Sequence, residues 1–307
     1  MSLVISISGI RGTIGGRPAE ALTPIDTVQF ASAYASWLIR DSGKERPTVV
    51  MGRDARISGP MVEQLVSATL TAMGVDVHLM GLATTPSVEM AVTETGADGG
   101  IILTASHNPA QWNALKLLNG QGEFLSGEDG EAILHMARAN DYSYADVKKL
   151  GTIKPLKGMD VKHIDQVLKL DLVKPELIKK KNFRVAIDCV NSVGGIILPR
   201  LLEALGVEEV IELYCDPTGD FPHNPEPLPE HLTEISKVMV SEKADVGFVV
   251  DPDVDRLAIV CEDGSMFGEE YTLVAVADYI LSRTPGNTAS NLSSTRALRD
   301  VTEGHGQ

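Results

Sequence analysis

The sequence predicts an α/β fold built from tandem similar domains with mostly parallel sheets and an active-site cleft between them. Short apolar runs alternate with longer amphipathic runs, and this alternation occurs twice in the same order. The two segments richest in chemically active side chains, residues 104–109 and 251–256, each follow the last apolar run of their copy. Because sites in open α/β sheets form at the carboxyl ends of strands, we expect both segments to face one cleft.

The first copy begins with an apolar strand at residues 48–51. An amphipathic run at 60–73 follows and stops at Gly74, as a helix stops at a C-terminal glycine. A strand at 75–79, a helix that begins near residue 86 and an apolar strand at 100–103 complete the copy. Such continuously apolar strands are typical of a parallel sheet with helices on both faces.

The second copy repeats this order, with strands at 184–187, 210–214 and 247–250 and helices at 196–205 and 229–241. Residues 97–100 align with residues 244–247, and the same offset places Ser106 opposite Asp253. The second copy also carries an insertion at 216–225.

Changes in composition give the domain boundaries. We expect residues 1–150 to form domain 1, and residues 151–265, entered through a basic and turn-rich stretch, to form domain 2. A strand at 257–260 closes domain 2, and a helical run occupies 270–281. Residues 283–307 start a further strand–helix unit that cannot bury its own apolar face. We therefore expect residues 266–307 to be the truncated start of a third domain.

Charge and composition exclude several classes of protein. The chain has 307 residues, with 27 Lys and Arg against 42 Asp and Glu and a formal net charge of −15. This balance argues against nucleic acid and anionic membrane as partners, because both attract basic surfaces. No apolar run approaches the roughly 20 residues of a membrane-spanning helix, and the N-terminus lacks the features of a signal peptide. Three widely spaced cysteines form neither a disulfide framework nor a CxxC metal site. We expect a cytoplasmic protein, of unspecified oligomeric state.

Residues 251–255 place the carboxylates of Asp251, Asp253 and Asp255 at alternating positions after an apolar strand. Hard oxygen ligands at this density suit Mg²⁺ or a similar cation, whereas a solvated acidic turn is the structural alternative. An EF-hand loop also begins D-x-D-x-D, but its sixth position is glycine and here is Arg256. A haloacid-dehalogenase loop prefers Thr or Val where Asp255 stands.

The segment at 104–109, Thr-Ala-Ser-His-Asn-Pro, offers a candidate nucleophile in Ser106, with His107 next to it in sequence. It lacks the G-x-S-x-G of a hydrolase nucleophile elbow, and a turn shaped by Asn and Pro explains it equally well.

Basic side chains accompany these segments. Arg11 lies between glycines in a loop where a guanidinium could contact phosphate. Arg53 and Arg56 follow the strand at 48–51, where a structural Arg–Asp network is as consistent as a ligand site. Without further context, we expect Lys116 to be an ordinary lysine on the surface.

Taken together, four segments resemble the α-D-phosphohexomutase family, which includes phosphoglucomutase/phosphomannomutase and phosphoglucosamine mutase. The segments occur in the family's order and are SGIRGT at 8–13, GRDARISG at 52–59, TASHNP at 104–109 followed by Asn113 and Lys116, and DPDVDR at 251–256. The resemblance extends over nearly the whole chain.

The resemblance implies a phosphorylated serine at Ser106 and one Mg²⁺ held by a phosphoserine oxygen together with Asp251, Asp253 and Asp255. It implies active-site cations at Arg11, Lys116 and Arg256, with Lys116 the best candidate for the general acid/base. The candidate catalytic residues are therefore Ser106, Lys116, Arg11, His107 and Arg256.

The implied reaction interconverts hexose 1-phosphate and hexose 6-phosphate through a sugar bisphosphate intermediate. Family members have four domains, and the substrate-reading loops of the third and fourth are not found here, so we expect impaired activity. Two alternatives remain: a metal-dependent phosphosugar-binding module without catalysis, and a haloacid-dehalogenase-type phosphatase with its nucleophile at Asp251. The sequence does not choose among glucose, mannose and glucosamine phosphates.

Overall fold

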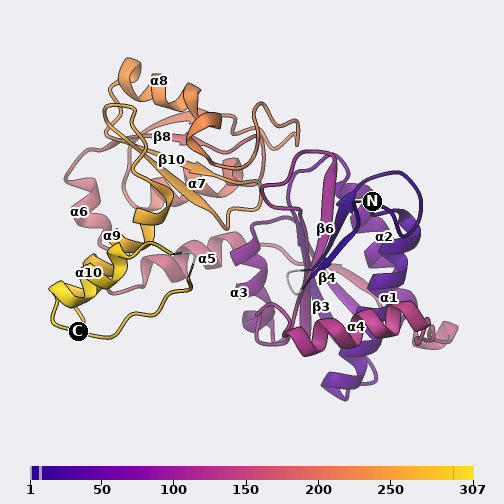
Figure 1. Cartoon of the computed structure of the whole chain (residues 1–307). Helices are drawn as coiled ribbons and strands as arrows, with labels where there is room; N and C mark the ends of the chain where they lie inside the picture. The colour runs from indigo at the N-terminus through magenta and orange to yellow at the C-terminus, as the bar shows by residue number, and fades with distance from the viewer. Residues whose placement is uncertain (1, 7–8, 293) are drawn as a thin grey trace.

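The computed structural model describes residues 2–6, 9–292 and 294–307, and Figure 1 shows two α/β units side by side. Helix α5 (Met159–Leu168) lies between the units, and helices α9 (Glu269–Leu281) and α10 (Ala297–Gly304) pack on each other beside the second unit. The predicted α/β class with tandem units is confirmed. Ser8 and Ser293, which belong to segments discussed above, lie outside the described residues.

The sheet of the first unit has the strand order β1-β2-β6-β5-β3-β4-β7. Strands β5, β3, β4 and β7 pair in parallel, whereas β1, β2 and β6 form an antiparallel edge that joins β5. The strands are β1 (Val4–Ser6), β2 (Gly9–Thr13), β3 (Thr48–Arg53), β4 (Asp76–Leu82), β5 (Gly99–Leu103), β6 (Trp112–Leu118) and β7 (Ile153–Pro155).

Helices cover both faces of this sheet because successive strand residues point to opposite sides. Val49 and Met51 of β3 pack in one buried cluster with side chains of α1 (Pro24–Ser42), α2 (Gly59–Ala72) and α4 (Gly127–Ala139). Val50 of β3 faces the other way, into a second cluster with side chains of α3 (Thr85–Thr95). A short 3₁₀ helix, η1 (Val147–Lys149), follows α4.

The second sheet has the order β11-β10-β8-β9, with β10, β8 and β9 parallel and β11 antiparallel to β10. Helix α8 packs on one face through Ile235 and Met239, and α7 packs on the other through Leu202. The remaining elements are α6 (Pro175–Lys179), β8 (Arg184–Asp188), α7 (Gly194–Ala204), β9 (Glu209–Leu213), η2 (Pro229–His231), α8 (Thr233–Glu242), β10 (Val246–Val250) and β11 (Leu257–Cys261).

Two expectations about elements need correction. The helix expected at 229–241 is divided into a 3₁₀ turn and a helix, because Leu232 between them leaves the helical conformation with a φ of −105° and a ψ of 26°. The strand expected after Arg283 is absent from the described residues between α9 and α10. That stretch contains Pro285, which lacks an N–H for a ladder, and no neighbouring strand pairs with it. Among the described residues, no helix has the length and apolarity to cross a bilayer.

Candidate active site

The loops that follow β5 and β10 meet where the two units touch. The Ser106 hydroxyl donates to Asp251 Oδ2 at 2.6 Å, and its Oγ lies 3.5 Å from Asp255 Oδ1. Each loop joins a parallel strand to the antiparallel strand beside it, β5 to β6 and β10 to β11. The expected proximity of serine and aspartates, which belong to different units, is therefore present.

The backbone of Ser106 has an uncommon conformation, with a φ of +49° in the left-handed region. Its N–H donates to Thr104 Oγ1 at 2.9 Å, and its carbonyl accepts from Arg56 Nη2 at 2.5 Å. Thr104 in turn donates to Asp54 Oδ2 at 2.7 Å. Main-chain groups on both sides of the Ser106 side chain are thus held by buried polar residues.

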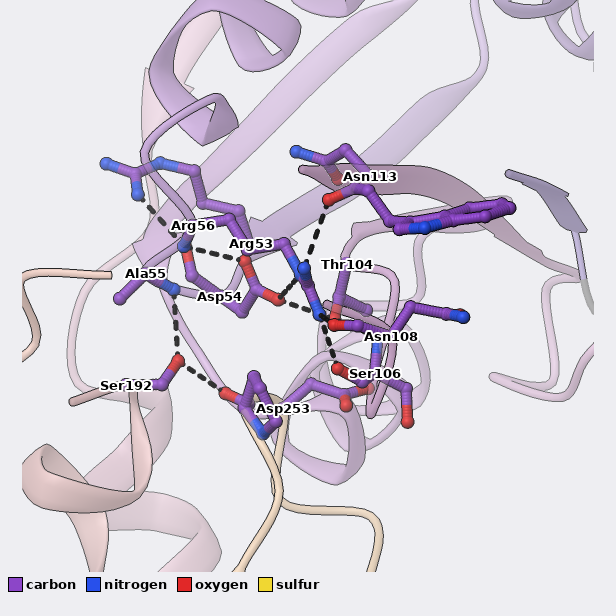
Figure 2. Close-up of polar contacts among 12 residues, drawn as sticks. Arg53, Asp54, Ala55, Arg56, Thr104, Ser106, Asn108, Asn113, Ser192 and Asp253 are labelled. Atoms are coloured by element: carbon purple, nitrogen blue, oxygen red, sulfur yellow. Dashed lines mark hydrogen bonds and ion pairs between the residues drawn. The ribbon is translucent and has the colours of Figure 1, made fainter. Parts of the chain in front are cut away.

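Arg56 and Asp54 form an ion pair in which both side chains are fully buried. Figure 2 shows the Arg56 guanidinium inserted among Asp54, Thr104, Ser106 and Asn108. The sequence left open whether this segment forms a structural Arg–Asp network or a ligand site. The structure shows the Arg–Asp network.

Backbone groups and a helix start shape the aspartate loop. Asp251 Oδ1 accepts from the N–H groups of Asp255 and Arg256, both at 3.1 Å. Thr85, the first residue of α3, donates through its N–H to the Asp253 carbonyl at 2.9 Å and through its hydroxyl to Asp253 Oδ2 at 2.5 Å. The start of a helix in the first unit thereby supports a carboxylate of the second.

The three aspartates form a compact group whose ligand oxygens lie within 4.8 Å of one another. Burial and the neighbouring charges of Asp253 and Asp255 raise the pKa of Asp251 well above its ordinary value. Burial also acts to raise the pKa of Asp253, but contact with Lys116 outweighs it and the pKa is lowered. Asp253 Oδ1 is buried without a hydrogen-bond partner among the described residues. Clustered, partly unsatisfied carboxylates of this kind can hold a metal ion.

Lys116 is a largely buried residue of β6 rather than a surface lysine. Its Nζ lies 2.8 Å from both Asp253 Oδ2 and Asp255 Oδ2. Burial alone would lower the pKa of this ammonium group, but the two carboxylates reverse the effect and raise it. The two carboxylates therefore favour the charged form of Lys116.

A cavity of about 210 Å³ opens beside these groups, and the predicted catalytic residues line it: Arg11, Ser106, His107, Lys116 and Arg256. His107 Nδ1 lies 3.4 Å from Ser106 Oγ. Burial, followed by the charge of Arg256, lowers the pKa of His107. Arg256 also pairs with Glu226 at 3.5 Å.

Two supporting residues escaped the sequence analysis. The buried hydroxyl of Ser192 accepts from the Ala55 N–H at 3.2 Å and donates to the Pro252 carbonyl at 2.7 Å, so it links both units (Figure 2). Thr85 was missed as well, although Thr84-Thr85-Pro86 marks a helix start that follows a strand. A helix start in that place could have pointed to Thr85, whereas nothing local distinguishes Ser192.

Comparisons with known proteins agree with this geometry. Residues 4–143 match the model for "phosphoglucomutase/phosphomannomutase, alpha/beta/alpha domain I", and residues 161–264 match the model for domain II. The chain is 32% identical to a phosphoglucomutase/phosphomannomutase of Thermococcus kodakarensis, over 100% of this chain and 66% of that protein. It is 34% identical to a phosphomannomutase/phosphoglucomutase of Pseudomonas putida, over 97% of this chain and 60% of that protein.

A crystal structure of a phosphoglucomutase/phosphomannomutase family protein from Burkholderia thailandensis has the same fold. It superimposes with a TM-score of 0.78 at 27% identity, over 97% of this chain and 65% of that one. The chain thus spans between 60 and 66% of the length of these two curated relatives.

Proposed function

Because the chain belongs to the phosphoglucomutase/phosphomannomutase family, we propose that it carries the phosphoserine and metal sites of an enzyme that interconverts hexose 1-phosphate and hexose 6-phosphate. One observation supports this above all: the Ser106 hydroxyl of the first unit is hydrogen-bonded to Asp251 of the second. A serine placed against a cluster of carboxylates matches a phosphoryl carrier beside a cation. Neither the non-catalytic module nor the phosphatase has support from the comparisons.

The residues present fit a hard divalent cation. Asp251, Asp253 and Asp255 supply carboxylate oxygens, and Asp253 Oδ1 has no other partner among the described residues. We assign this site to Mg²⁺, which favours oxygen ligands. When bound, the ion would neutralise charge on the serine oxygen during transfer.

In the proposed cycle, phospho-Ser106 donates its phosphoryl group to a free hydroxyl of a hexose monophosphate. The bond from phosphorus to the serine oxygen breaks as the bond to the sugar oxygen forms, and the proton of the sugar hydroxyl passes to the serine oxygen. The sugar bisphosphate then turns around, and its other phosphoryl group returns to Ser106. Phosphoryl transfer depends mainly on positioning and charge neutralisation, which this cavity supplies.

The basic residues of the cavity take separate roles in this proposal. Arg11 and Arg256 line the cavity and would hold phosphate oxygens. Lys116, whose pKa is raised, would donate its proton to the serine oxygen as the phosphoryl group leaves and would take up the proton released by the sugar hydroxyl; the reverse step returns both protons. His107 would hydrogen-bond near the same oxygen. We also propose a cytoplasmic location, consistent with three free cysteines.

The experiment that tests the proposal measures phosphate on the protein. Incubation with glucose 1,6-bisphosphate and Mg²⁺ should add one phosphate, seen by intact mass and mapped to the peptide that contains Ser106. Ser106→Ala should gain none. Ser126→Ala, at the exposed N-terminus of α4, is the matched control and should behave as wild type. Equal phosphate uptake by Ser106→Ala would refute the serine role.

The preferred sugar is found by comparing substrates. Isomerase assays with glucose, mannose and glucosamine phosphates would rank the substrates, since the two relatives' names already include both glucose and mannose.

A further inference from the structure

Arg56 lies next to the site but has no role in the proposed chemistry. Arg56 is fully buried and uses every N–H of its guanidinium. Nε donates to Asp54 Oδ2 at 3.0 Å, Nη1 donates to the carbonyls of Pro109 and Trp112, and Nη2 donates to those of Ser106 and Asn108. These four bonds to carbonyls range from 2.5 to 3.1 Å.

The four carbonyls belong to the loop that carries Ser106, and they span it from its first turn to the start of β6. A planar fork can reach carbonyls on both sides of a loop at once, whereas an ammonium group is a single point charge. Arg56 therefore cross-braces the loop in a way that a lysine at this position cannot reproduce.

The brace acts on the unusual backbone of Ser106. The Ser106 carbonyl accepts from Arg56, and the Ser106 N–H donates to the Thr104 hydroxyl. Thr104 in turn donates to Asp54, which is the ion-pair partner of Arg56. A non-glycine residue with a φ of +49° persists only where its surroundings fix it. That conformation directs the hydroxyl toward Asp251.

Arg56 also connects to the second unit. Its guanidinium lies 5.1 Å from the ring centroid of Phe221, in the insertion at 216–225 that distinguishes the second copy. The adjacent Ala55 N–H is bound by Ser192. The segment that fixes the serine loop is thus itself fixed against the unit that carries the aspartates.

Resting on the proposed function, we infer that Arg56 is the positioning residue for Ser106: with Asp54 and Thr104 it imposes the left-handed backbone that aims the serine oxygen at the metal site. Its charge is neutralised by Asp54, so its contribution is geometric. Misplacing a reacting group by about 1 Å can cost about 10²-fold in rate.

The test compares Arg56→Lys with wild type in single-turnover transfer of phosphate from glucose 1,6-bisphosphate to Ser106 in the presence of Mg²⁺. The variant should transfer about 10²-fold more slowly at saturating donor, with the half-saturating donor concentration changed by no more than about twofold. Val66→Ala, in the buried core of the same unit, controls for lost stability and should keep the wild-type rate below its melting temperature. A wild-type rate in Arg56→Lys would overturn the inference.

A second pair of variants covers the case in which Arg56→Lys does not fold. Thr104→Val removes the hydroxyl that links Ser106 to Asp54 and should slow the same step, whereas Thr104→Ser keeps the hydroxyl and should restore it. Equal rates in the two Thr104 variants would contradict the inference.

The two proposals fail in different ways. Phosphate uptake by Ser106→Ala, or no uptake by wild type, would remove the proposed function. The positioning role is then decided by a crystal structure of Arg56→Lys. A retained left-handed Ser106 with its hydroxyl on Asp251 would refute the role, and a displaced hydroxyl would support it.

Discussion

At the scale of single residues, the buried cationic side chains near the site are paired with carboxylates. Arg56 is paired with Asp54, and Lys116 with Asp253 and Asp255. The sequence pointed to Asp253 and Asp255 as cation ligands through their spacing, and to Lys116 only through the family resemblance. It could not predict their contacts, since Lys116 and its partner Asp253 are 137 positions apart.

A pair of ionisable side chains away from the site, His223 and Asp188, predicts a pH dependence of stability. His223 Nε2 lies 3.0 Å from Oδ2 of the buried Asp188. Burial lowers the pKa of His223, but the hydrogen bond and charge of Asp188 outweigh it and raise the pKa. The unfolded histidine has a pKa of about 6.5, so the stabilisation is fully present below that pH and is lost as the pH rises through the folded pKa.

We therefore expect the wild type to be more stable than His223→Gln, and the difference in their free energies of unfolding to be larger at low pH than at high pH. The increase should be about 1 kcal/mol, because a hydrogen bond to a charged group is stronger than a neutral one by about that amount. Denaturant titrations of both proteins at about pH 5.5 and 8.5 measure the difference. A gap that widens as the pH rises would show that the sign is wrong.

At the scale of elements, the sequence analysis placed the strands and helices of the two repeats, because apolar runs and glycine stops mark them, but it did not place α1, α4 or α5. Strand β3 runs two residues beyond the expected end, to Arg53, and the helix expected at 229–241 is divided. Such ends depend on tertiary hydrogen bonds. The Asp54 N–H, for example, donates to the Leu103 carbonyl of β5, an interaction that no local pattern reveals.

Helix α1 offers a test at this scale. Its buried N-cap, Thr23, accepts from the Asp26 N–H, and the Asp26 side chain accepts from the Thr23 N–H, which completes a capping box. Thr23→Ala should lower the free energy of unfolding by about 1 kcal/mol, because such caps contribute about 0.5 to 2 kcal/mol. Thr71→Ala, which removes an exposed hydroxyl bond to the Ala68 carbonyl near the end of α2, is the control and should change little. Equal effects of the two substitutions in denaturant titration would argue against the cap.

At the scale of the whole molecule, the proposed cation site brings together oxygens from both units, Ser106 from the first and the three aspartates from the second. Mg²⁺ should therefore stabilise the folded chain. At about 100 times its Kd, a ligand that binds only the folded state adds about 2.7 kcal/mol to the free energy of unfolding, and EDTA should remove this gain.

The matched variants for that measurement are Asp255→Asn and Glu262→Gln, which remove the same charge. Asp255 belongs to the cluster, whereas Glu262 is exposed beyond β11. At one fixed Mg²⁺ concentration the gain should shrink in Asp255→Asn and persist in Glu262→Gln. An undiminished gain in Asp255→Asn would place the ion elsewhere.

The Ser192 hydroxyl, which touches Ala55 and Pro252 at once, has a mechanical consequence. Sliding one unit against the other would break the Ala55–Ser192 bond together with the bonds of Ser106 to Asp251 and of Thr85 to Asp253. These hydrogen bonds therefore resist independent movement of the two units at their contact.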